Sequence, residues 1–255
     1  MSARCQFWVI ILLTVSVLPI DDVAADSRDD IAQVVRLLGY GGGIHNFKNY
    51  VLRGREEYHA AASQDFNEAL SRLEGLKGLA EFSTQEQAAI DDVRVTIDAY
   101  RRGLDKITEL RTKDWRLEDI DLVVVVDDTA AISALDLLRS KWQWNDLEEM
   151  EFQLGYGKGI HNFKNYVLRG QERYHTEALE NFLAAESLIT SQLAAPGLSD
   201  RREAALQTVN RVTRAYREYL PLIERLLAMM RNVEQLDLAV KVNDLPAFDA
   251  LELLR

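Results

Sequence analysis

The chain has 255 residues, of which 47% are hydrophobic, and it carries a formal net charge of -11 at pH 7. This composition can build a folded core, and the acidic excess disfavours binding to nucleic acid and to anionic lipid surfaces. The single cysteine, Cys5, lies near the N-terminus. A mature chain without that segment has no disulfide, no cysteine-bound metal and no covalently attached haem, and we predict no cofactor.

Residues 1–25 have the pattern of a secretory signal segment. Residues 1–4 include a basic arginine, residues 7–20 are apolar, and Ala25 ends a small-residue cleavage site. The apolar run is shorter than the roughly 20 residues that span a bilayer, and Pro19 interrupts its end. We therefore expect cleavage after Ala25 and a periplasmic or secreted protein. An uncleaved membrane anchor is the alternative.

An internal repeat without gaps occupies the rest of the chain. Residues 24–139 (the first copy) align with residues 140–255 (the second copy), at an offset of 116 residues. We take residues 26–139 and 140–255 as two helical modules. Residues 39–54 (GYGGGIHNFKNYVLRG) recur as residues 155–170 (GYGKGIHNFKNYVLRG), whereas only about a third of the positions are identical elsewhere. We call these sixteen residues the shared block, and expect it to carry what both copies require.

Helix-start patterns divide each copy in the same way. The capping-box patterns at residues 30–33 and 146–149 predict a long first helix in each copy. The patterns at residues 84–87 and 200–203 predict a second helix that runs back antiparallel to the first.

After the second helix, each copy has a segment with weaker signals. Residues 117–126 and 233–242 suit a short helix or an extended linker, and a last short helix should begin near Asp128 and Asp244. The predicted fold class is all-α. Two tandem long helical hairpins, each with a short third helix, should form one or two antiparallel helix bundles.

On one straight first helix, the polar residues of the shared block would form a stripe opposite its core face. Exposed neighbours of this stripe have changed between the copies, as Arg55 against Gln171 shows. The stripe itself is unchanged, so we expect it to bind a ligand, with its lysines and arginines attracting an anionic group. The candidate ligand-binding residues are His45, Lys48, Asn49, Arg53, Glu56 and His59, with His161, Lys164, Asn165, Arg169, Glu172 and His175.

Counting along the hairpins suggests carboxylate partners for two histidines. His45 should lie opposite Glu118 and His161 opposite Glu234, and Asp121 and Asp237 follow one turn later. The repeated glycines at 39 to 43 would lower the stability of a helix interior, so another interaction must offset that loss. We favour close packing over a backbone contact to a ligand.

Metal and enzyme chemistry are less well supported. Residues 56–59 and 172–175 have the Glu-x-x-His spacing of di-iron bundles, but the second copy lacks the carboxylates of the partner helix. We therefore predict no metal site, and a mononuclear or haem site would have to join histidines of both copies. No nucleophile, base and orienting group occur together, so we do not expect an enzyme.

The string G-Y-G-x-x-I-H-N-F-K-N-Y-V-L-R at residues 39–53 and 155–169 is followed by looser helix starts at residues 126–135 and 242–251. Together they resemble the extracytoplasmic helical sensory module of some bacterial chemoreceptors, sensor kinases and cyclic-dinucleotide enzymes. The resemblance implies a periplasmic ligand-sensing module. Those proteins continue into a membrane span and an output domain, whereas this sequence ends at Arg255.

We therefore expect a binding protein for an unknown small molecule that acts with a membrane receptor or kinase. Two alternatives remain open. In the first, the stripes face each other across a pseudo-two-fold axis, or across a homodimer, and serve only assembly. In the second, the protein carries a metal or haem.

Overall fold

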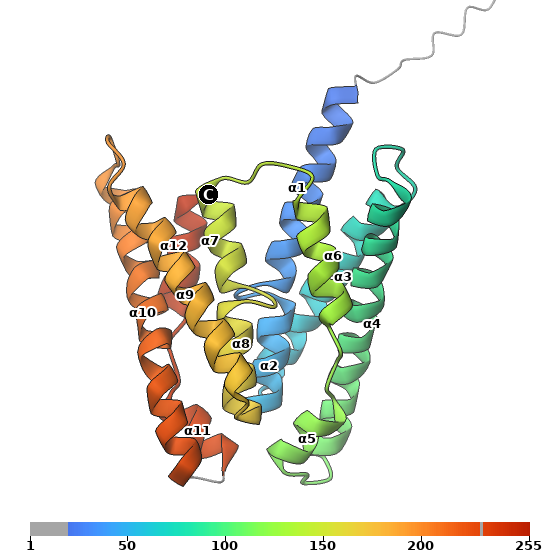
Figure 1. The fold of residues 1–255 in the computed structure, drawn as a ribbon. Coiled ribbons are helices and arrows are strands. Elements are labelled where there is room, and N and C mark those ends of the chain that lie inside the picture. The colour runs from blue at the N-terminus through green and yellow to red at the C-terminus, as the bar shows by residue number, and fades with distance from the viewer. Residues whose placement is uncertain (1–19, 230–231) are drawn as a thin grey trace, which may run out of the picture.

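The computed structural model describes residues 20–229 and 232–255. These residues form helices and no strands, which confirms the predicted all-α class (Figure 1). No helix in this part of the chain is long and apolar enough to cross a membrane. The predicted signal segment falls mainly on residues 1–19, outside the described residues, and the predicted cleavage point after Ala25 lies within the first helix.

Six helices belong to each copy. The first copy has α1 (Ile20–Leu38), α2 (Gly43–Arg53), α3 (Glu56–Leu76), α4 (Thr84–Arg111), α5 (Leu117–Val123) and α6 (Thr129–Arg139). The second copy has α7 (Asp146–Leu154), α8 (Gly159–Arg169), α9 (Glu172–Leu193), α10 (Asp200–Met229), α11 (Val233–Ala239) and α12 (Leu245–Leu254). The short helices expected near Asp128 and Asp244 are α6 and α12.

The predicted long first helix was wrong, because each copy divides it into three. The first break is the glycine turn at residues 39–42, where Gly41 has a φ of 85°. The second is Gly54, which closes α2 in the left-handed conformation with a φ of 63°. Glycine adopts this conformation without the steric penalty of a Cβ, and it commonly ends helices for that reason.

Several predicted helix starts were also displaced. The capping residues are Ser83 for α4 and Asn145 for α7, each one residue before the expected position. Each forms a capping box with the glutamate three residues later. Asp30 starts no helix, because α1 already begins at Ile20.

Within each copy the long helices pack as an antiparallel layer. In the first copy, α3 packs against α1 and α4, and α6 lies on α4; in the second, α9 packs against α7 and α10, and α12 lies on α10. The two layers stand side by side, with α2 and α8 between them and α5 and α11 at one end (Figure 1). Phe66 and Phe182, which are repeat equivalents, are fully buried in the two cores.

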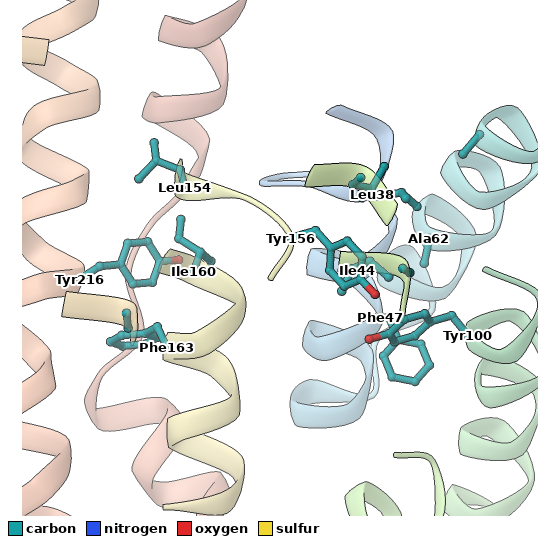
Figure 2. Close-up of a cluster of buried hydrophobic side chains, with 14 of the residues drawn as sticks. Leu38, Ile44, Phe47, Ala62, Tyr100, Leu154, Tyr156, Ile160, Phe163 and Tyr216 are labelled. Carbon is teal, nitrogen blue, oxygen red and sulfur yellow. The ribbon is translucent and has the colours of Figure 1, made fainter. Parts of the chain in front are cut away.

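The two glycine turns cross each other where the copies meet. A Cβ on Gly155 would lie 3.2 Å from Cα of Gly39, so these backbones are in van der Waals contact. This close approach confirms the packing interpretation of these glycines. Each turn then places its tyrosine in the other copy: Tyr156 lies beside Tyr100, with ring centroids 6.3 Å apart (Figure 2), and Tyr40 packs on Phe248 at 4.7 Å.

Replacing Gly43 with alanine should destabilise the protein, because the new Cβ would lie 2.5 Å from Cε1 of Phe66. Overpacking of this kind costs about 1 to 3 kcal/mol. Urea denaturation monitored by circular dichroism measures the change in the free energy of unfolding. Gly75→Ala in α3 is the matched control, since its Cβ would meet nothing within 4 Å. Equal stability of the two variants would contradict the packing assigned to Gly43.

Candidate functional site

Helices α2 and α8 have almost no exposed face. Every residue of α2 is buried except Asn46 and Arg53, and in α8 only Arg169 is not buried. The polar stripe of each helix therefore lies against the other copy. Eight of the predicted site residues lie at this contact: His45, Lys48, Asn49 and Arg53, with His161, Lys164, Asn165 and Arg169.

Two arginines of the stripe form ion pairs across the contact. Arg53 donates to both carboxylate oxygens of Asp237, from Nε at 2.8 Å and from Nη2 at 3.0 Å. Arg169 pairs in the same way with Asp121, at 2.8 and 3.2 Å. Burial opposes each guanidinium charge, but the hydrogen bonds and charge of the aspartate outweigh it and raise the arginine pKa. Each copy thus supplies the counter-ion for the other.

The histidines also face carboxylates of the opposite copy. Nε2 of His45 lies 3.5 Å from Asp244, and Nε2 of His161 lies 3.4 Å from Asp128. The predicted partners Glu118 and Glu234 were therefore wrong. That prediction assumed that the segments of one copy contact only each other, whereas the loops before α6 and α12 contact the neighbouring copy.

Burial keeps these histidines neutral near pH 7. It lowers the pKa of His161 to about 4, although Asp128 acts in the opposite direction. It also lowers the pKa of His45 well below the ordinary range, with Lys164 and Arg53 adding to the shift. Nδ1 of both rings is buried and has no hydrogen-bond partner among the described residues.

The lysine and asparagine pairs break the two-fold symmetry. Nζ of Lys164 donates to Oδ1 of Asn49 at 2.5 Å. The equivalent bond, from Lys48 to Asn165, is not formed. Oδ1 of Asn165 is buried without a partner, and within the described residues the side chain of Lys48 makes no hydrogen bond or ion pair, although Lys48 is only 4% exposed.

Lys48 and Asn165 line a groove between the copies with a volume of about 650 Å³. His161 and Arg169 also line it, so four stripe residues meet in one open space. Sequence reasoning missed other lining residues, because they differ between the copies or lie outside the shared block. These are, among others, the cations Lys158 and Arg173 and the carboxylates Asp127, Asp128 and Glu177.

The remaining predicted residues do not join this site. Glu56, His59, Glu172 and His175 follow the break at Gly54 or Gly170 and belong to α3 and α9. Glu56 accepts a hydrogen bond from Tyr50 at 3.3 Å, and the ring of His59 packs edge-on against the same tyrosine. In the described part of the chain, no three histidine, cysteine, aspartate or glutamate side chains form a group that could hold a metal.

Aspartates that are identical in the two copies could have identified the partners of the histidines from the sequence. Asp128 and Asp244 are identical at the offset of 116, as are Asp121 and Asp237. Asp244 also accepts hydrogen bonds from Tyr40 at 2.7 Å and from Tyr216 at 2.5 Å. Retained aspartates outside the shared block therefore complete the contact.

Comparisons with protein-family models, with curated proteins and with solved structures find no match for this chain.

The buried lysines predict an unusual pH dependence of stability. Burial lowers the pKa of Lys48 and of Lys164 to about 8, from an ordinary value of 10.5. Between these values the unfolded chain holds more protons than the folded chain, so stability rises with pH. Buried Tyr100 and Tyr216, whose pKa burial raises, reverse this trend above pH 10 or so.

The free energy of unfolding should therefore increase by roughly 2 kcal/mol between pH 8 and 9.5. Urea denaturation at several pH values measures this slope. The double variant Lys48→Met, Lys164→Met should flatten it, whereas replacement of the exposed Lys77 by methionine should leave it unchanged. A slope that is the same in all three proteins would show that the two buried lysines are not its origin.

Proposed function

We propose that this protein is an extracytoplasmic, sensor-like binding protein whose groove between the copies takes a small anionic molecule. The observation that carries the proposal is Lys48, a residue only 4% exposed, which lines the groove and makes no side-chain hydrogen bond or ion pair within the described chain. An ammonium group that has lost most of its hydration and has no partner is costly. An anion in the groove would remove that cost through a charge-assisted hydrogen bond.

The charges around the groove support an anionic ligand. Four cationic side chains line it against three carboxylates, whereas the whole chain has a net charge of -11. One of these cations, Arg169, is already held by Asp121. Lys158 lies 3.6 Å from Asp136, and Arg173 donates to the hydroxyl of Tyr174 at 2.7 Å. Lys48 is therefore the cation best placed to bind a ligand.

Asn165 favours a ligand that carries a hydrogen-bond donor. Its buried Oδ1 accepts no hydrogen bond from the described residues, and a ligand hydroxyl or amide would satisfy it. The groove volume of about 650 Å³ lies in the range of small-molecule sites. These features favour an anion that also carries a neutral donor, such as a hydroxy acid.

The shared block supports the biological setting. Its resemblance to the sensory modules of bacterial receptors favours a periplasmic location and a membrane receptor or kinase as the partner. The pseudo-two-fold arrangement would present two related surfaces to such a partner.

A second candidate function is assembly without a ligand. The exchanged pairs Arg53 to Asp237 and Arg169 to Asp121 favour it, because they explain why much of the shared block is retained. They do not explain Lys48 and Asn165, whose side chains make no hydrogen bond with the described residues.

Replacing Lys48 with methionine tests the ligand proposal. Inorganic phosphate and a panel of small hydroxy acids serve as probes in calorimetric titrations, and native mass spectrometry of protein from its own source extends the panel. Loss of a hydrogen bond to a charged group should weaken binding by roughly 10- to 150-fold. Lys164→Met is the matched control and should change affinity by no more than about threefold, since Lys164 does not line the groove. Equal affinities would contradict the proposal.

Substitution of the two asparagines distinguishes the assembly hypothesis from the ligand proposal. Asn49→Ala removes the acceptor of Lys164 and should destabilise the protein by about 1.5 to 3 kcal/mol. Asn165→Ala removes no hydrogen bond made by its Oδ1 and should cost less than about 1 kcal/mol. Thermal melting measures both, and sedimentation reports any change of shape or association. Equal losses in the two variants would favour a purely structural role for the stripe.

A further inference from the structure

A second cavity lies between the first copy and α12 of the second copy, beside a glycine whose repeat equivalent is a lysine. In the second copy, Nζ of Lys158 lies 3.6 Å from Asp136 and 4.8 Å from the ring centroid of Phe152. The repeat equivalent of Lys158 is Gly42. A cavity of about 260 Å³ lies beside Gly42, whereas Lys158 lines the groove of about 650 Å³ described above.

The residues around this cavity have changed with the loss of the lysine. Glu252 stands at the position of Asp136 and pairs with Arg255. Asp65 replaces Asn181 and adds a second carboxylate. Arg36 replaces Phe152, so a cation now stands where the second copy has an aromatic ring.

Arg36 has no partner of its own in the described part of the chain. Its Nε is buried and makes no hydrogen bond, and burial lowers its pKa, with nearby Arg255 adding to the shift. The acidic neighbours are already engaged, because Glu151 and Glu252 both pair with Arg255. The guanidinium is therefore available to an anion from outside.

Asp65 presents the opposite charge in the same cavity. It forms no ion pair with any described residue, and burial raises its pKa to about 6. The aromatic rings of Tyr40 and Phe248 line the space as well. The cavity thus offers a cation, carboxylates and an apolar wall.

We propose that this cavity binds a small zwitterion with a primary ammonium group and a carboxylate, such as an amino acid. The carboxylate would pair with Arg36, and the ammonium group would pair with Asp65. Carbon atoms between the two charges would pack on Tyr40 and Phe248. This site is separate from the groove at Lys48 and does not depend on it.

Calorimetric titration and thermal melting of the full chain test the proposal. The probes are L-alanine, L-leucine, L-lysine and γ-aminobutyrate, at up to about 10 mM, where weak binding is detected. Butylamine and butyrate, which each carry one of the two groups, are the matched controls. At least one zwitterion should bind, and neither control should bind as tightly.

Two variants carry the residues that the second copy already tolerates. Arg36→Phe and Asp65→Asn should each weaken binding of the zwitterion by about tenfold or more, whereas Lys48→Met should leave it unchanged. Loss of anion binding with retained zwitterion binding in the Lys48→Met variant would support two separate sites. The absence of binding by every zwitterion, or binding that survives both substitutions, would overturn the proposal.

Discussion

The contact between two glycine turns is the constraint on which the rest of the structure depends. The backbones of Gly39 and Gly155 touch, and a Cβ on Gly155 would lie 3.2 Å from Cα of Gly39, so a side chain there would push the copies apart. Because the turns cross, Tyr40 and Tyr156 each enter the core of the opposite copy. The two copies therefore share one continuous core, and neither has all of its buried contacts without the other.

This crossing places α2 and α8 side by side. The arginines of the stripe then need carboxylate partners from the other copy. Arg53 and Arg169 each take an aspartate from the other copy, with bidentate geometry. Such pairs are costly to break one partner at a time, since a buried charge is left behind. The retention of the block in both copies follows in large part from this reciprocity, because a change in one copy affects the contacts of the other.

The departures from symmetry are more informative about binding than the symmetry itself. Lys164 is satisfied by Asn49, whereas Lys48 faces an open groove. Gly42 borders a cavity in which the side chain of Arg36 makes no hydrogen bond or ion pair with the described residues, whereas Lys158, the repeat equivalent of Gly42, lies 3.6 Å from Asp136 at the edge of the groove.

The sequence by itself determined the helical class, the repeat and the helices α6 and α12, because periodicity and capping depend on neighbouring residues. It also located eight residues of the contact between the copies, since they belong to the shared block. Only the tertiary structure decided that α2 ends at Gly54, which removed Glu56 and His59 from the stripe. It likewise decided which carboxylate meets which cation. Those partners are far apart in the chain, and the crossing that joins them depends on packing between the copies, which no local pattern records.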